Sequence, residues 1–225
     1  MNRSPKKAVC IISGGMDSAL SAKIAQDEGY EIIALHFNYG QRTQNKELEA
    51  FRKIAQTLEA VESYEIDLDF FEQIGASALT DKRIDVPTGG IEAGIPVTYV
   101  PFRNGIFLSI AAALAEKHGA TALFIGVVEE DSSGYPDCRE AYIQQMQRAI
   151  NLGTKDETNL EIRMPLVAMS KAQIVTEALR RDVPLAYTWS CYKEEELACG
   201  VCDSCRLRLN GFAQAGVEDP IAYAP

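Results

Sequence analysis

The sequence lacks any run of 18 apolar residues, so it predicts no helix that spans a membrane. Its first nine residues, MNRSPKKAV, lack the apolar centre of a secretory signal peptide. Low-complexity tracts and internal repeats are also missing. With a composition that is ordinary for a soluble protein, these absences lead us to expect a cytoplasmic location and no membrane partner. In a reducing compartment, thiols bind metal ions more often than they form disulfides.

Positive charge and histidine are both scarce. The chain has 22 Lys and Arg residues against 32 Asp and Glu residues, which gives a formal net charge of −10. Nucleic-acid backbones are bound by clustered Lys and Arg, and no basic stripe is evident, so we expect no nucleic-acid partner. The histidines are His36 and His118 alone, which makes a mechanism based on histidine unattractive. At 225 residues, the chain is long enough for one large domain, with or without a small appendage.

Apolar runs typical of buried strands alternate with segments of helical periodicity. The expected strands cover residues 8–12, 30–40, 61–68 and 121–128, and the expected helices cover residues 17–29, 43–60, 104–119, 141–153 and 170–182. This alternation predicts an α/β fold in which a parallel sheet carries helices on both faces. Ligands of such folds bind at the carboxyl ends of the strands. Residues 76–101 are rich in Gly, Pro and Thr and predict a loop near that site.

The first expected strand ends in the sequence SGGMDS, at residues 13–18, where a helix begins. A Gly-rich turn that opens a helix points backbone N–H groups and the positive end of the helix dipole at its occupant, which is usually phosphate. The alternative is a tight turn whose glycines only permit unusual backbone angles. The P-loop is excluded because no Lys follows the glycines, and the spacing differs from the dinucleotide fingerprint.

The pattern S-G-G-x-D-S after a buried strand resembles the PP-loop of the ATP pyrophosphatase superfamily. Those enzymes grip the pyrophosphate of ATP and transfer AMP to a carbonyl or carboxylate oxygen. On this resemblance, the Ser hydroxyls donate to phosphate, the glycines let the backbone approach it, and Asp17 caps the helix or holds Mg²⁺. The expected ATP-binding segment consists of Ile12, Ser13, Gly14, Gly15, Met16, Asp17, Ser18, Ala19, Leu20, Ser21 and Ala22.

Four cysteines near the end of the chain follow the spacing C-x7-C-x2-C-x2-C. They are Cys191, Cys199, Cys202 and Cys205. In a cytosolic chain this spacing is typical of a tetrahedral Zn²⁺ site, with an iron–sulfur cluster or two disulfides as the alternatives. Since sulfur fills all four positions, we expect one structural Zn²⁺ per subunit that pins the C-terminal segment against the domain. Cys10 lies in the first apolar strand and is expected to belong to the core.

Three further stretches sharpen the resemblance: NYGQR at 38–42, RNGIFLS at 103–109 and GVVEEDSSGYPDCREAYI at 126–143. Together with the four cysteines, their order and spacing resemble the 7-cyano-7-deazaguanine synthase family of queuosine precursor biosynthesis, from about residue 9 to residue 211. Two positions depart from the family pattern. Thr43 stands where the family often has His, and Phe102 stands where it often has Gly.

The resemblance implies a Rossmann-like fold of the adenine nucleotide alpha hydrolase-like type, ATP as a substrate, a structural zinc and a homodimer. It implies an ATP-dependent ligase that forms C–N bonds and converts 7-carboxy-7-deazaguanine and ammonia into 7-cyano-7-deazaguanine through an adenylated carboxylate and an adenylated amide. We expect a catalytic domain over residues 1–185 and a zinc-binding segment over residues 186–225 that packs on it.

For catalysis, the resemblance and the chemistry single out Asp17, Arg103 and Lys171. Lys171 opens an expected helix and either reaches the phosphates or is a solvated lysine at the helix end. Arg103 is expected to hold the substrate carboxylate or a phosphate.

The expected substrate residues are Tyr39, Gln41, Arg42, Asp131, Tyr135, Asp137 and Arg139. The amine edge of a deazaguanine suits a carboxylate, from Asp131 or Asp137, and Tyr135 offers a ring for stacking. The alternative for this stretch is a turn built by Gly and Pro with solvated carboxylates. Tyr39, Gln41 and Arg42 could equally be side chains that stabilise a loop. Cys138 either attacks the substrate or packs beside it.

Three other functions fit part of the pattern. A PP-loop tRNA-modifying adenylating enzyme, of the thiolase or lysidine type, would act on RNA, and the acidic balance counts against it. An amidotransferase-type ligase would stop at the amide. A zinc-stabilised nucleotide-binding module would perform no catalysis.

Overall fold

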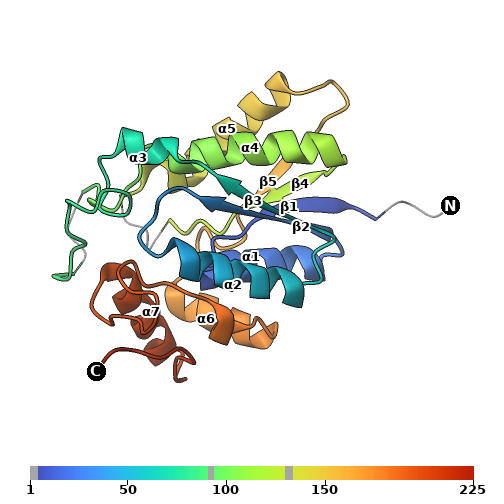
Figure 1. The fold of residues 1–225 in the computed structure, drawn as a ribbon. Helices are drawn as coiled ribbons and strands as arrows, with labels where there is room; N and C mark the ends of the chain where they lie inside the picture. Colours follow the sequence, from blue (N-terminus) through green and yellow to red (C-terminus); the bar gives the residue numbers. More distant parts are fainter. Residues whose placement is uncertain (1–4, 91–93, 130–133) are drawn as a thin grey trace.

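The computed structural model describes residues 5–90, 94–129 and 134–225 (Figure 1). The described part contains a five-stranded, all-parallel sheet with the strand order β3-β2-β1-β4-β5. The strands are β1 Lys7–Ile11, β2 Glu31–Asn38, β3 Glu62–Asp67, β4 Ala122–Phe124 and β5 Glu161–Arg163. The order reverses at β1, so the carboxyl ends of β1 and its two neighbours open onto a crevice where such sheets bind ligands.

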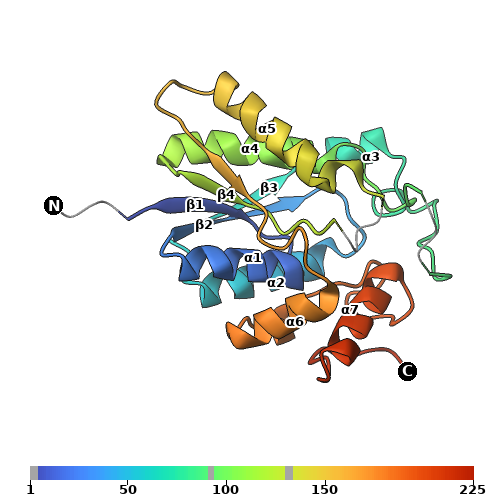
Figure 2. The same cartoon turned by 180° about the vertical axis from the view of Figure 1, so that it is seen from behind.

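Helices cover both faces of this sheet, as the alternating pattern predicts. One face carries α1 (Met16–Asp27), α2 (Gln44–Thr57) and α6 (Lys171–Arg180), and the other carries α3 (Phe70–Ile74), α4 (Arg103–His118) and α5 (Glu140–Gly153) (Figures 1 and 2). Helix α7 (Asp203–Gln214) packs against α6, near the chain's carboxyl end. Short 3₁₀ turns cover Pro136–Cys138 and Leu185–Tyr187. No helix in the described ranges is long and apolar enough to cross a membrane.

Two apolar clusters hold the layers together, one on each face of the sheet. The cluster under α1, α2 and α6 includes Leu20, Phe51 and Phe124, which are fully buried. The cluster under α4 and α5 includes Leu108 and Ile143, also fully buried. Cys10 lies in the first cluster with 1% exposure, so the expectation of a core residue is confirmed. Burial raises the pKa of the Cys10 thiol, which therefore stays protonated.

The expected strand over residues 121–128 is too long, because only three of its residues form β4. Gly126 marks the departure from the sheet. A Cβ at Gly126 would lie 2.8 Å from the backbone of Asp17 and Ser18, so this position lets the chain pass directly over the start of α1. The segment thereby brings Val127 and Val128 to the ligand side of the sheet.

The C-terminal segment contacts the loop that follows β1. The backbone N–H of Trp189 donates to the carbonyl oxygen of Gly14 at 2.9 Å. Within the segment, the Arg208 side chain is 1% exposed and pairs with Asp219 at 2.7 Å, and Tyr223 donates to the same carboxylate at 2.7 Å. A buried charge needs such pairing, so the last residues of the chain are anchored to α7.

Candidate active site

The loop between β1 and α1 is stabilised by its own serines. Ser18 Oγ accepts the N–H of Ser13 at 3.1 Å and donates to the carbonyl oxygen of Gly15 at 2.9 Å. Gly14 has a φ of +93°, and a Cβ there would lie 2.6 Å from the carbonyl oxygen of Glu47, so only glycine fits. Gly15 is the N-cap of α1 and has no side chain to cap the helix. The first-turn N–H groups therefore remain directed at the space above the loop.

Asp17 and Lys171 bridge the starts of α1 and α6. Lys171 Nζ donates to Asp17 Oδ2 at 2.6 Å, and the two side chains are 14% and 27% exposed, respectively. The other oxygen, Asp17 Oδ1, is buried and has no hydrogen-bond partner among the described residues. A buried carboxylate oxygen without a donor is costly, and a hard cation such as Mg²⁺ is a suitable partner for it.

Arg103 lies at the start of α4 and contacts Tyr39, in the loop that follows β2. Its Nη1 donates to the hydroxyl of Tyr39 at 2.8 Å, and its guanidinium lies 5.2 Å from the Tyr39 ring centre and 5.8 Å from that of Phe107. Arg103 Nε is buried without a hydrogen-bond partner in the described part of the chain. Burial raises the pKa of Tyr39 to about 12, so its hydroxyl keeps its proton at neutral pH. The pair can offer two kinds of donor to an anionic ligand.

Arg42 differs from its neighbours because its guanidinium is used within the fold. It donates to the carbonyl oxygens of Ala78, Asp81 and Ile84 at 2.7, 3.2 and 2.7 Å. These bonds anchor part of the loop over residues 76–101 beside the pocket. The structure therefore favours the loop-stabilising alternative for this residue.

Asp137 lies behind the pocket wall. It is 4% exposed, and its Oδ2 accepts the backbone N–H of Asn104 at 2.9 Å, in the first turn of α4. Burial raises the pKa of the Asp137 carboxyl, and the Asn104 N–H opposes that shift. Arg139 is exposed at the start of α5. Asp131 lies outside the described residues.

Among the described residues from 134 to 143, Tyr135 and Cys138 line the pocket. The Tyr135 hydroxyl lies 2.7 Å from Thr98 Oγ1. Cys138 Sγ accepts the side-chain N–H of Asn104 at 3.2 Å. This contact holds the thiol in place and favours the packing alternative for Cys138.

One pocket gathers residues from these separate elements. The expected site residues that line it are Ile12, Ser13, Gly15, Met16, Asp17, Ser18, Tyr39, Gln41, Arg42, Arg103, Tyr135 and Lys171. Those that do not are Gly14, Ala19, Leu20, Ser21, Ala22, Asp137 and Arg139. The four α1 residues are at most 1% exposed, because successive positions of a helix turn away from the ligand side into the core.

Several lining residues were not expected from the sequence. They include Thr43, Glu47, Thr98, Asn104 and Tyr192. Glu47 had a signal that could have identified it: a carboxylate one turn after the NYGQR motif, at the start of an amphipathic helix. The others lie on segments that only tertiary packing brings to the pocket.

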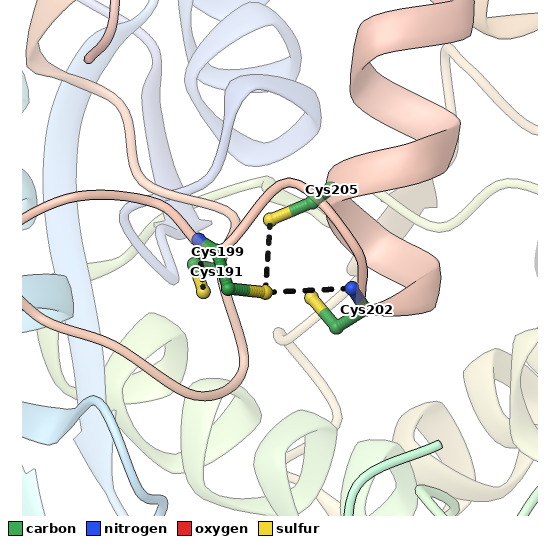
Figure 3. A group of neighbouring side chains, drawn as sticks. All are labelled: Cys191, Cys199, Cys202 and Cys205. Atoms are coloured by element: carbon green, nitrogen blue, oxygen red, sulfur yellow. Dashed lines mark hydrogen bonds between the residues drawn. The ribbon is translucent and has the colours of Figure 1, made fainter. Parts of the chain in front are cut away.

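The four C-terminal cysteines form a compact sulfur cluster, in which all four sulfurs lie within 4.8 Å of one another (Figure 3). Cys191 Sγ accepts the backbone N–H groups of Lys193, Glu194 and Cys199, each at 3.4 Å. Such N–H···S bonds stabilise thiolates. Zn–S bonds of about 2.3 Å place tetrahedral sulfurs roughly 3.8 Å apart, and the Cys199 and Cys205 sulfurs are 4.0 Å apart. None of the described cysteines is in a disulfide, so the cluster fits a four-sulfur metal site.

Comparison with solved structures supports the fold. A 4-thiouridine synthetase–RNA complex with bound ATP aligns with a TM-score of 0.53 and 19% identity, over 94% of this chain and 50% of that one. A predicted subunit of tRNA methyltransferase from Methanocaldococcus jannaschii aligns with a TM-score of 0.50 and 19% identity, over 78% and 74% of the two chains. At these identities the likeness concerns the fold alone, and the predicted fold class is confirmed.

Comparison of sequences is more specific. The chain is 82% identical over 218 residues to a 7-cyano-7-deazaguanine synthase of Sulfurovum sp. (strain NBC37-1), covering 97% of this chain and 98% of the relative. It is 70% identical over 224 residues to the protein of the same name from Aliarcobacter butzleri (strain RM4018), covering 99% and 98%. A family model described as queuosine biosynthesis protein QueC matches residues 7–216. The resemblance expected from the motifs is therefore confirmed, and the chain belongs to the queuosine biosynthesis protein QueC family.

Proposed function

We propose that this chain is an ATP-dependent ligase that converts 7-carboxy-7-deazaguanine and ammonia into 7-cyano-7-deazaguanine. The carboxylate is adenylated first, ammonia displaces AMP to give an amide, and the amide oxygen is adenylated in turn. The observation that carries the proposal is a single pocket that combines the Ser-Gly loop, the Asp17–Lys171 pair and the Arg103 guanidinium, in a chain of this family.

The chemistry explains why such a pocket is needed. Converting a carboxylate into a nitrile removes two oxygens, and neither leaves as hydroxide or oxide at neutral pH. Transfer of AMP makes each oxygen part of a phosphate leaving group. The enzyme must therefore neutralise phosphate charge, align two reactants and exclude water.

We assign the loop over residues 13–18 to the pyrophosphate of ATP. Its backbone N–H groups and the α1 dipole supply the positive field, and the glycines permit close approach. Lys171 lies next to this loop and exchanges its bond to Asp17 for one to phosphate when ATP binds. Asp17 would then hold Mg²⁺, which neutralises phosphate charge when it is bound.

We assign the opposite wall of the pocket to the deazaguanine. Arg103 and the Tyr39 hydroxyl receive its carboxylate, because both are donors at neutral pH. Tyr135 provides a ring for stacking. Asp137 positions the start of α4 through the backbone N–H of Asn104. Reading of the amine edge by Asp131 or Asp137 stays a prediction.

We assign the sulfur cluster to one structural Zn²⁺ per subunit. With four sulfur ligands the ion has no open position for a substrate, so its contribution is to the folding of residues 186–225. Trp189 connects this segment to Gly14, so zinc also stabilises the loop assigned to ATP. A homodimer, a cytoplasmic location and the absence of a nucleic-acid partner remain parts of the proposal.

The mass of the product tests this function. We expect the purified chain, given 7-carboxy-7-deazaguanine, nitrogen-15 ammonium, ATP and Mg²⁺, to release a nitrile that contains nitrogen-15, and to release none without ATP. A product that stops at the amide would instead indicate an amide-forming ligase. ATP turnover that requires tRNA would indicate an RNA-modifying enzyme.

A further inference from the structure

We propose that the Glu47 carboxylate is the base that accepts protons from nitrogen during both C–N bond-forming stages. This role rests on the proposed function, because it assumes ammonia attack and nitrile formation in the same pocket. Glu47 belongs to the first turn of α2 and lines the pocket together with Asp17, Arg103 and Tyr135. Its own carbonyl oxygen packs against Gly14 of the loop assigned to ATP.

The structure holds Glu47 by both carboxylate oxygens. Thr43 Oγ1 donates to Oε1 at 2.7 Å, and Gln41 Nε2 donates to Oε2 at 3.2 Å. The orientation of the Gln41 amide follows from two backbone groups. Its oxygen accepts the Tyr39 N–H at 2.8 Å, and its nitrogen donates to the Phe37 carbonyl oxygen at 3.3 Å. Neither backbone group can exchange donor and acceptor roles, so the amide must present N–H to Glu47.

The Thr43 hydroxyl suits either charge state of this carboxylate. It lies near two acceptors, Glu47 Oε1 at 2.7 Å and the Cys191 carbonyl oxygen at 3.1 Å, and it has one proton to share. When Glu47 is ionised, the hydroxyl donates to it. When Glu47 is protonated, its O–H donates to Thr43, and the Thr43 proton turns to Cys191. In both states the Glu47 carboxyl group and the Thr43 hydroxyl thus keep a hydrogen bond to each other without movement of any heavy atom, which suits a group that repeatedly gains and loses a proton.

The electrostatic surroundings of Glu47 bring its pKa into the range that suits a general base at neutral pH. Burial raises the pKa of Glu47 to about 7, against the opposing effect of the Thr43 and Gln41 donors. Arg103 of α4 lowers it and Glu195 of the C-terminal segment raises it. A base whose pKa is near the working pH is present in its ionised form and still binds protons well.

The other described carboxylates of the pocket belong to other parts of the proposed site. Two more described carboxylates line it: Asp17, which is paired with Lys171, and Asp203, which directly follows Cys202 of the sulfur cluster. Neither histidine lines the pocket. Glu47 is therefore the carboxylate best placed for proton transfer.

The proton count defines what this base must do. Ammonium loses one proton to become a nucleophile. Its nitrogen then bonds to the acyl carbon, the bond from that carbon to the AMP oxygen breaks, and a second proton leaves. In the second stage the adenylated amide loses two N–H protons as the remaining C–O bond breaks and the nitrile forms. Glu47 accepts these protons one at a time and passes each to solvent, and no oxidant or reductant is needed.

The Glu47→Gln variant tests this role. The glutamine amide reproduces the protonated carboxyl, because it donates to Thr43 and accepts from Gln41. We expect substrate-dependent ATP–pyrophosphate exchange without ammonia to stay within about threefold of wild type, since that step moves no proton from nitrogen. Nitrile formation is expected to fall roughly 10²–10⁴-fold, the usual effect of losing a general base.

The pH profile gives a second measurement. Wild-type nitrile formation is expected to decline as pH falls below about 7, because Glu47 becomes protonated, whereas the residual rate of Glu47→Gln lacks that decline. Glu49→Gln is the matched control, since Glu49 is an exposed carboxylate of the same helix that pairs with Lys46 and Lys53. It is expected to behave as wild type in both assays.

Nitrile formation at the wild-type rate by Glu47→Gln would overturn the role of Glu47 alone. Equal losses of exchange and nitrile formation would also overturn it, because they would indicate a contact to ATP or a structural role. If the wild-type chain itself forms no nitrile, the proposed function falls first and the role of Glu47 falls with it.

Discussion

The Asp17→Asn variant is expected to lose substrate-dependent pyrophosphate release by roughly 10²–10³-fold, the effect of removing one electrostatic contact to developing charge. Asparagine keeps the shape of the side chain and removes its charge. The amide keeps one oxygen, so Lys171 Nζ loses its negatively charged partner. In addition an NH₂ group replaces either Oδ2, which lies 2.6 Å from Lys171 Nζ, or the buried Oδ1, which we propose as the oxygen for Mg²⁺. Both effects act on the phosphates of ATP.

The same substitution should change stability little. The Asp17–Lys171 pair is partly exposed, at 27% and 14%, and a pair of this kind contributes on the order of 1 kcal/mol. Pyrophosphate release and thermal unfolding are the two measurements. Asp27→Asn is the matched control, because Asp27 is at the other end of α1 and pairs with Lys23 and Arg181 away from the pocket. Full activity in Asp17→Asn would contradict the role assigned to this carboxylate.

The Cys202→Ser variant is expected to lose its metal and, with it, the folded C-terminal segment. Wild-type protein should contain about one zinc per chain, and the variant less than about one tenth of that, because a four-sulfur site loses a ligand. Limited proteolysis should then cut within residues 186–225. Activity should fall as well, because Trp189 no longer supports Gly14 and Cys191 no longer accepts from Thr43.

Cys10→Ser separates loss of metal from loss of stability. Cys10 is buried in β1, far in sequence from the sulfur cluster, so this substitution should lower stability and leave the zinc content unchanged. Metal analysis and proteolysis of both variants give the comparison. A Cys202→Ser protein that stays folded, active and free of zinc would show that the metal is not structural.

Most of the fold could be predicted from the sequence, because buried parallel strands appear as runs of apolar residues and the helices between them show apolar residues at helical spacing. The exceptions have physical causes. Strand β5 (Glu161–Arg163) has three residues, two of them charged, and pairs only at the edge of the sheet. Helix α7 contains a glycine, and half of its residues are polar, so its pattern gives little sign of a helix. Its position against α6 gives it the apolar contacts that it needs.

The site was predictable where it is local in sequence. Residues 13–18 form one turn, so their motif identifies them directly. The segment through Ala22 was predicted as one binding run, but a helix directs only some of its residues to a ligand. Thr98 and Asn104 reach the pocket through packing of distant segments, and the Asp137 carboxylate accepts the backbone N–H of Asn104 in α4 instead of facing the pocket. No spacing rule for a single stretch contains those contacts.

The central claim is that each oxygen of the substrate carboxylate leaves as part of AMP. Isotopic labelling of these two oxygens tests it most directly. The purified chain would receive 7-carboxy-7-deazaguanine labelled with oxygen-18 at both carboxylate oxygens, with ammonium, ATP and Mg²⁺. If each oxygen leaves as part of AMP, mass spectrometry will find a nitrile without oxygen-18 and AMP that carries one labelled oxygen per molecule. Oxygen-18 in water or in inorganic phosphate, with unlabelled AMP, would contradict the account.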